Sequence, residues 1–181
     1  LFGHKVCPEG PVPTTDRINI LRFGTTPLER HVEDFIVERT VPYEPLKTLN
    51  IVDTPGTNSI VDKHQEITER YIPRADLVFF VTSIDGAYTA SEKQFLSLIH
   101  ERWRKKIVFL LTKIDAQTPE AVEQVRAFIR SNAEEHFGFE PLVIPISPRD
   151  AYRGRTEGDA ALFARSNFQQ LEDFLFETLS D

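Results

Sequence analysis

Two apolar, β-branched runs in this chain each end abruptly at a charged turn. Residues 49–56 read LNIVDTPG, and residues 107–115 read IVFLLTKID. Continuous apolar runs bounded by turn residues predict strands that are buried on both faces of a parallel sheet. Each run carries an aspartate, Asp53 or Asp115, to the carboxyl end of its strand. In open α/β sheets, that end is where ligands bind.

The remaining pattern alternates strands with helices. Apolar runs predict further strands, while 3.6-residue periodicity and capping residues predict helices. The expected strands cover residues 17–23, 35–40, 77–82 and 142–147, and the expected helices cover 58–71, 89–103, 117–137 and 168–179. Residues 151–159, which include Gly154 and Gly158, are predicted to form a loose loop. With no repeat and no linker, the alternation indicates one α/β domain over residues 1–181.

The second motif, Thr112-Lys113-Ile114-Asp115, has the chemistry of a guanine-specific site. The Asp115 carboxylate can accept hydrogen bonds from the ring N–H and the exocyclic amine of guanine, and adenine offers no such donor pair on that edge. An unpaired buried polar group costs about 1–3 kcal/mol, which disfavours the wrong base. The methylene stem of Lys113 can lie along the purine face. Thr112, Lys113 and Asp115 are therefore candidate nucleotide-binding residues.

The first motif, Asp53-Thr54-Pro55-Gly56, fits the phosphate and metal side of such a site. Asp53 can hold Mg²⁺ through water, because this ion gives up its waters reluctantly. Gly56 has no Cβ, so its backbone can come close to a terminal phosphate. Alone, this motif could be a simple turn, and the second could be a strand followed by a helix cap. Found in this order after buried strands, they resemble the magnesium-side and guanine-side motifs of P-loop GTPases.

Two further segments fit this resemblance. Residues 142–147 read LVIPIS, and Ser147 resembles the serine of the last guanine-binding loop, although a plain strand end explains it equally well. Upstream, PVPTT precedes a strand. Thr15, with Thr14 as the second choice, resembles a switch threonine that binds Mg²⁺ and positions the attacking water. The alternative is a proline-stiffened loop in which Thr15 merely precedes the strand.

Three longer runs resemble the GTPase domain of bacterial dynamin-like proteins, which are related to the mitofusins. These runs are CPEGPVPTTDRINILRFG, LNIVDTPGTNSI and ADLVFFVTSIDGAYTASEKQFL. Thr57 stands where Ras-like enzymes carry a water-orienting glutamine. The resemblance implies GTP and GDP as ligands, Mg²⁺ as cofactor, and hydrolysis coupled to membrane remodelling. It also implies self-assembly through GTPase domains and membrane contact through regions outside this chain.

No GxxxxGK[ST] sequence occurs in the chain. In this family that loop cradles the phosphates and lies upstream of the switch threonine. The opening residues, Leu1-Phe2-Gly3, resemble the end of the helix that follows it. The resemblance therefore implies a three-layer P-loop GTPase fold with a mostly parallel sheet, from which the amino-terminal strand and P-loop are missing. We expect hydrolysis in the intact parent and none in this segment alone.

Composition narrows the class of partner. The net charge of −7 argues against nucleic acid as a partner, since phosphate backbones bind basic faces. One cysteine excludes an internal disulfide, and no apolar run has the length of a membrane span. The expected location is cytoplasmic, either free or peripheral to a membrane. Two alternatives to a dynamin-like enzyme stay open: a soluble regulatory or translation-type GTPase, and a non-catalytic interaction module that retains the fold.

Overall fold

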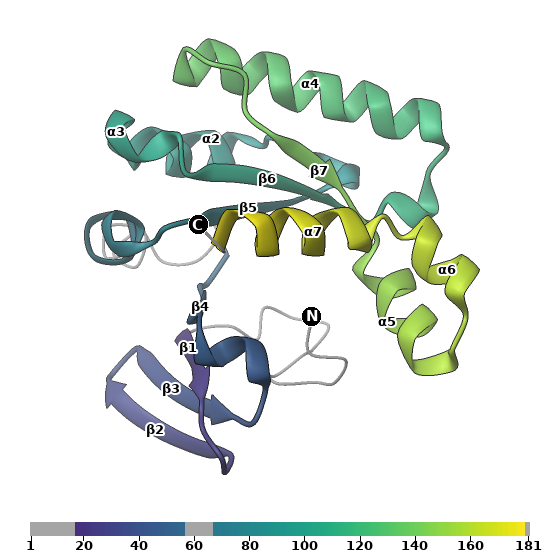
Figure 1. Cartoon of the computed structure of the whole chain (residues 1–181). Helices are drawn as coiled ribbons and strands as arrows, with labels where there is room; N and C mark the ends of the chain where they lie inside the picture. The colour runs from purple at the N-terminus through teal and green to yellow at the C-terminus, as the bar shows by residue number, and fades with distance from the viewer. Residues whose placement is uncertain (1–16, 57–66, 180–181) are drawn as a thin grey trace. The chain divides into compact units, whose positions relative to one another are not determined.

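The computed structural model describes residues 17–56 and 67–179. The chain divides into two compact units, residues 1–67 and 68–181, and each unit has its own sheet (Figure 1). The single domain expected from the sequence stays a prediction. Of the helix expected over 58–71, the structure describes only the end, where η2 (Ile67–Tyr71) is a π-helical turn.

The first unit is built on a four-stranded sheet with the order β2-β3-β1-β4. Its elements are β1 (Ile18–Phe23), β2 (Leu28–Glu33), β3 (Ile36–Val41), η1 (Glu44–Lys47) and β4 (Ile51–Asp53). β1 runs parallel to β3, whereas the β2–β3 and β1–β4 pairs are antiparallel. The buried apolar side chains of this unit include Ile18, Leu21, Ile36, Val37 and Leu46. Every residue of β2 is exposed.

Strand β4 differs from the buried parallel strand predicted over residues 49–52. It is three residues long, its described partner β1 is antiparallel, and Val52 is 39% exposed. Residues 42–50, which connect it to β3, hold two prolines and the single turn η1. A parallel return needs a crossover of about a dozen residues or more, so the shorter connection reverses the chain. Asp53 still ends the strand, as predicted.

The second unit contains a parallel sheet with the order β5-β6-β7. Its strands are β5 (Val78–Ser83), β6 (Ile107–Thr112) and β7 (Val143–Pro145). Its helices are α2 (Ala90–Leu98), α3 (Glu101–Arg104), α4 (Pro119–Phe137), α5 (Pro148–Glu157), α6 (Ala160–Arg165) and α7 (Phe168–Leu179), with short turns η3 (Ile72–Arg74), η4 (Ile84–Gly86) and η5 (Ile114–Ala116). The parallel, buried strand predicted from residues 107–112 is confirmed. β5 is less buried than predicted, since Val81 is 60% exposed.

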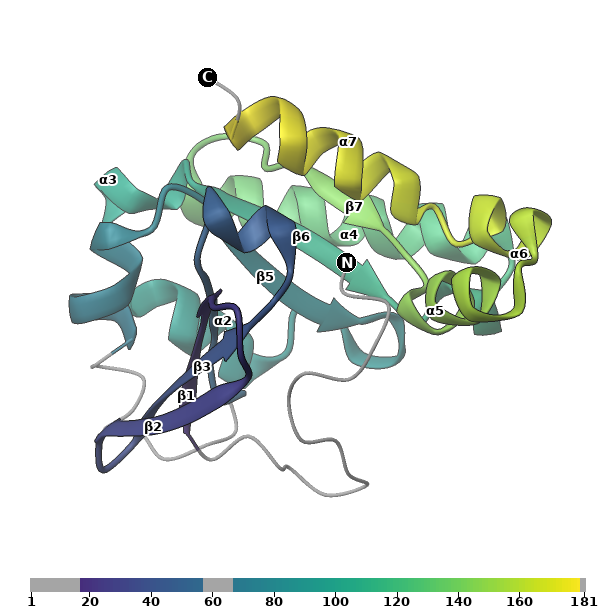
Figure 2. The same cartoon turned by 60° about the horizontal axis from the view of Figure 1, so that its bottom comes forward.

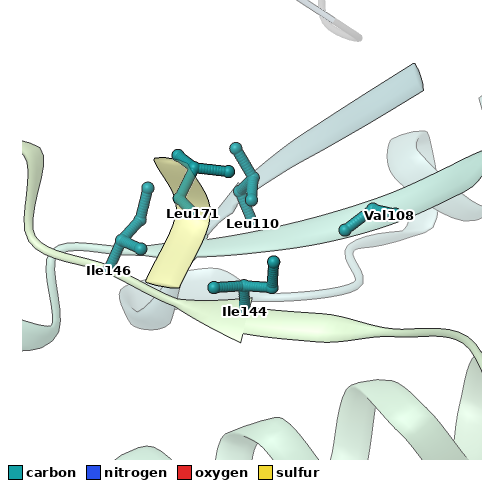
Figure 3. Packing of buried hydrophobic residues seen from close by; sticks show 5 residues of the cluster. All are labelled: Val108, Leu110, Ile144, Ile146 and Leu171. Atoms are coloured by element: carbon teal, nitrogen blue, oxygen red, sulfur yellow. The ribbon is translucent and has the colours of Figure 1, made fainter. Parts of the chain in front are cut away.

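Helix α7 covers one face of this sheet, and α4 lies on the other (Figures 1 and 2). The core under α7 consists of five aliphatic side chains from β6, α7 and the β7 segment (Figure 3): Val108, Leu110, Ile144, Ile146 and Leu171. Burying each such side chain stabilises the fold by about 1.5–3 kcal/mol. The predicted packing of one face of the last helix on the sheet is confirmed.

Aromatic side chains fill the opposite face. Phe109, which is fully buried, has its ring centroid 5.3 Å from Phe80 of β5 and 6.2 Å from Phe137 of α4. Phe80 in turn lies 6.1 Å from Phe95 of α2. The second unit is therefore a three-layer α/β arrangement, as the sequence predicts.

Capping residues set the ends of two predicted helices. α4 begins after Thr118, whose hydroxyl accepts from the backbone N–H of Ala121, and it ends at Gly138 in the left-handed conformation (φ +78°). These bounds agree with the predicted helix over 117–137. The predicted helix over 89–103 is wrong in extent, because α2 ends at Leu98 and a separate turn, α3, starts after His100.

The loop predicted over residues 151–159 is a helix, α5. Gly154 is there for close packing: a Cβ at this position would lie 2.6 Å from the backbone N of Phe163 in α6. Gly158 ends the helix with φ +71°, a conformation that favours glycine. Both glycines look like loop residues in the sequence. In the structure, Gly154 allows α5 to pack closely against α6, and Gly158 ends α5.

Candidate functional site

The turn after β6 positions the second motif. Thr112, the last residue of the strand, donates its hydroxyl to the carbonyl of Thr82 in β5 at 2.9 Å. Lys113 follows in the left-handed region (φ 62°), which is uncommon for a residue with a side chain. This sharp turn starts η5, which contains Asp115. The carboxylate therefore lies just beyond the carboxyl end of the central strand of this sheet.

Both oxygens of Asp115 have partners. Ser147 donates its hydroxyl to Oδ1 at 2.6 Å, although the two residues are 32 positions apart. Arg149 Nη2 lies 2.7 Å from Oδ2. The Asp115 side chain is only 7% exposed, so these contacts satisfy a carboxylate that is largely removed from water.

Ser147 connects this carboxylate to helix α5. It is the N-cap residue of α5, and its side-chain oxygen accepts from the backbone N–H of Asp150 at 3.1 Å. Its own backbone N–H donates to the carbonyl of Ser166 at 2.8 Å. The residue is 1% exposed. The structure thus brings together Ser147 and Asp115, two of the predicted site residues, and fixes both with hydrogen bonds.

Lys113 lies beside a residue that the motif did not include. Its Nζ is 3.4 Å from Oδ2 of Asp85, the second residue of η4, the turn that follows β5. The lysine side chain is 64% exposed. Ser83 donates to the same carboxylate oxygen at 3.3 Å. This contact between turns after β5 and β6 orients the lysine near the strand ends while leaving most of its stem in solvent.

Three charged residues of this edge were missed from the sequence: Asp85, Arg149 and Asp150. Arg149 and Asp150 belong to the run SPRD, which begins at Ser147. In this run Pro148 opens a helix and Asp150 occupies its first turn. The proline and the capping serine were a signal for a helix start at this point. Recognising that start would have placed Arg149 and Asp150 in the first turn of a helix, while the contact of Arg149 with Asp115 is visible only in the structure.

Asp53 lies in the first unit, at the end of a chain of polar contacts across its sheet. Asn19 Nδ2 donates to Asp53 Oδ2 at 3.3 Å, and Arg39 Nε donates to Asn19 Oδ1 at 3.3 Å. Arg39 also pairs with Glu29 at 2.6 Å. Burial raises the pKa of Asp53 above the ordinary value of 3.8, and the Asn19 hydrogen bond opposes this rise. The carboxylate therefore stands in a site where the charged form is disfavoured.

The other predicted residues of the phosphate side are placed only in part. Apart from its neighbours along the chain, no described residue has an atom within 4 Å of a Cβ built on Gly56, so this position has open space at its side. Thr14 and Thr15 lie outside the described residues. Within residues 17–56 and 67–179, no group of three or more histidine, cysteine or acidic side chains forms a metal cluster.

The chain matches a family model described as the dynamin family over residues 30–114. It is 34% identical over 200 residues to a probable transmembrane GTPase, the chloroplastic FZO-like protein of Arabidopsis thaliana, with 99% of this chain and 22% of that protein covered. It is 27% identical over 131 residues to dynamin-like protein A of Bacillus subtilis strain 168, covering 70% of this chain and 11% of that protein. The chain thus spans about a fifth of the plant relative's length and about a tenth of the bacterial one's.

The fold agrees with these matches. A solved structure of an oligomerised bacterial dynamin pair, described as a mechanism for long-range sensing and tethering of membranes, superimposes with a TM-score of 0.81 at 16% identity, over 98% of this chain and 35% of that one. Because the identity is low, this likeness shows the shared fold. The chain belongs to the dynamin family.

Proposed function

We propose that this chain is the guanine-nucleotide-binding part of a GTP-hydrolysing protein of the dynamin family. The observation that carries the proposal is the Asp115–Ser147 pair at the carboxyl edge of the parallel sheet, with a 2.6 Å hydrogen bond that holds the carboxylate in one orientation. A fixed, largely buried carboxylate at a strand end is the group that reads the donor edge of guanine. The family membership of the chain supports GTP as the nucleotide.

Four residues form the base side of the proposed site. Asp115 accepts the ring N–H and the exocyclic amine of guanine. Ser147 keeps the carboxylate in place, because it donates to Oδ1 and is itself anchored at the N-terminus of α5. Lys113 lies over the purine with its stem, which is exposed and directed by Asp85. Thr112 acts indirectly, since its hydroxyl is used on Thr82 to fix the strand end.

The phosphate side fits a magnesium ion held through water. Mg²⁺ usually keeps several waters and takes one or two protein carboxylates together with phosphate oxygens. A single partly buried carboxylate, Asp53, with Asn19 to orient it, meets that requirement. A magnesium ion bound beside Asp53 would supply positive charge to neutralise the phosphates during hydrolysis. Thr15, or Thr14 in its place, supplies a further metal ligand and positions the attacking water, and the Gly56 backbone approaches the terminal phosphate.

The cellular role is proposed from the relatives. One relative's name describes a transmembrane GTPase, and the solved neighbour is an oligomerised pair that tethers membranes. We propose that this protein likewise self-associates through its GTPase domains and couples hydrolysis to membrane remodelling. In the part of the chain that the structure describes, no helix is both long and apolar enough to cross a bilayer. From the likeness to these relatives, we propose that regions outside this chain make the membrane contact and that the location is cytoplasmic, free or peripheral to a membrane.

The test is nucleotide selectivity of the full-length protein and its Asp115→Asn variant. The wild type is expected to bind GTP at least about a hundredfold more tightly than ATP, since the wrong base leaves buried polar groups unpaired. In the variant, the asparagine amide donates where the carboxylate accepted, so preference moves from GTP to XTP. Titration calorimetry with GTP, ATP and XTP measures both effects.

Asp173→Asn is the matched control, because that aspartate is exposed on α7, its carboxylate accepts a hydrogen bond from Gln169, and the substitution makes the same change of charge. Its selectivity should equal that of the wild type. Unchanged selectivity in Asp115→Asn would remove Asp115 from the base site and with it the proposed function.

A further inference from the structure

Arg149 occupies the position on Asp115 that a guanine base requires. It is the second residue of α5, and its guanidinium lies 2.7 Å from Asp115 Oδ2 through Nη2. Its Nε donates to Oδ1 of Asp150 at 3.2 Å. The two carboxylates are 7% and 3% exposed, whereas the Arg149 side chain is 63% exposed. The arginine thus bridges two buried anions from the solvent side.

The guanidinium resembles the donor edge of guanine in chemistry. Both groups are planar and present N–H donors on neighbouring nitrogens, and both pair with a carboxylate through parallel hydrogen bonds. Ser147 already uses Oδ1 of Asp115. A carboxylate oxygen has two lone pairs, so Ser147 can stay on Oδ1 while a base binds. The planar guanidinium covers Oδ2 from the solvent side, so it competes with an incoming base for this oxygen.

Asp150 provides a second anchor for the displaced arginine. Its carboxylate is buried, accepts from Arg149 Nε, and also lies 3.4 Å from Arg165 Nη2. Arg149 can therefore release Asp115 while its charge stays near Asp150. This lowers the cost of displacement, because Asp150 keeps its cations and the donors of the base satisfy Asp115 in place of the arginine.

We propose that Arg149 is an internal competitor for the base: it holds Asp115 in the nucleotide-free protein and is displaced onto Asp150 when guanine binds. This inference rests on the proposed function and adds a specificity device to it. The competitor keeps the base-reading carboxylate oriented and satisfied in the free protein, and it lowers the affinity for nucleotide. Bases without the two donors cannot replace what Asp115 loses when the arginine leaves.

The kinetic consequence separates this role from direct contact with nucleotide. Removing a group that acts only in the free protein raises the association rate and leaves the dissociation rate unchanged. Because the cation of this pair is exposed, we take the pair to contribute about as much as a surface ion pair, up to about 1 kcal/mol, so Arg149→Gln should bind GDP about three- to fivefold more tightly. Salt screens such a pair. The difference between the variant and the wild type should therefore shrink between low and high salt.

The experiment is stopped-flow binding of GDP and ADP to the full-length wild type, Arg149→Gln and Arg153→Gln, at about 0.05 and 0.5 M salt, which span strong and weak screening. Arg153 is the matched control, because it lies on the same helix, is 53% exposed and pairs with Glu157 instead. We expect faster GDP association for Arg149→Gln alone, with unchanged dissociation. Should that variant fail to fold, Arg149→Lys tests the same point, since an ammonium pairs less well with two carboxylates and should give a smaller gain in the same direction.

The outcomes distinguish the two proposals. No preference of the wild type for GDP over ADP would remove the proposed function. Clear GDP preference together with faster dissociation from Arg149→Gln would show that Arg149 contacts the bound nucleotide. Clear preference with unaltered rates in both arginine variants would show that the Asp115 contact has no effect on binding. Either of the last two results overturns the competitor role and leaves the base site standing.

Discussion

The two units hold their candidate aspartates in opposite ways. Asp115 follows a strand that is buried in a parallel sheet between helices, and a hydroxyl and a guanidinium satisfy its carboxylate. Asp53 follows a three-residue strand in a sheet whose β2 is exposed along its length, and burial raises its pKa. Among the described residues, the Asp115 carboxylate is held by contacts that the fold itself supplies, whereas the Asp53 carboxylate stands where its charged form is disfavoured. For the proposed function, this means that Ser147 orients the base-reading carboxylate before a nucleotide arrives, whereas Asp53 gains a countercharge only when its ligand binds.

The largest expected effect is a loss of stability in the second unit, whose aromatic core supports the sheet that carries Asp115. Phe109→Ala removes a fully buried ring that contacts Phe80 and Phe137, so it should lower the free energy of unfolding by about 3–5 kcal/mol. Trp103, the one tryptophan of the chain, lies in the second unit and reports its unfolding by fluorescence in denaturant. Val81→Ala is the control, because that side chain is 60% exposed and should change stability by about 0.5 kcal/mol or less. Equal losses in both variants would contradict the packing described for the aromatic face.

A smaller effect tests the serine that joins α5 to Asp115. Ser147→Ala removes the N-cap acceptor of Asp150 N–H and the donor to Asp115, so a loss of about 2 kcal/mol in stability is expected. It should also weaken GDP binding and reduce discrimination against ADP, because the carboxylate loses its fixed orientation. Thr118→Ala is the matched control: it removes the N-cap of α4 at a cost of about 1 kcal/mol, and the Thr118 hydroxyl accepts from the backbone N–H of Ala121 in its own helix. If both variants lose base discrimination equally, Ser147 acts through general stability alone.

The smallest expected effect is the change of stability with pH that Asp53 causes, and its direction follows from the raised pKa of this residue. A raised folded-state pKa means that the native protein binds the proton more tightly than the unfolded chain, so stability is lost as pH rises from about 3.8 through the raised pKa. Asp53→Asn removes this loss. At pH 7 the variant should be as stable as the wild type or slightly more stable, and the difference should disappear as pH falls toward 3.8. Hydrogen exchange of the β1 and β4 amides across this pH range measures it, and the same variant should lose magnesium-dependent nucleotide binding.

Asp34→Asn, an exposed aspartate in the same unit, controls for the change of charge. Its exchange should follow the wild type at each pH. A variant Asp53→Asn that is less stable than the wild type at pH 7 would mean that the Asn19 hydrogen bond outweighs burial, and the contrast between the two aspartates would fail.

Local sequence determined the elements whose cause is local. The apolar run of β6, the Thr118 and Gly138 caps of α4, and the apolar stripe of α7 each fix a structure within one stretch of chain, and all three are confirmed. The helix α5 was missed because Gly154 and Gly158 resemble loop residues unless their neighbours are known. The same holds for the direction of β4, which a short connection to β3 decides.

The sequence by itself determined which residues could read guanine and hold magnesium, because carboxylate chemistry and its place after an apolar strand are visible in a single segment. Only the tertiary structure decided what Asp115 contacts before a base arrives. Ser147 and Arg149 come from a segment more than thirty positions away, and parallel strands with a helix between them bring that segment alongside. Hydrogen bonds depend on distances of about 3 Å, and no pattern along the chain specifies those distances across such a separation.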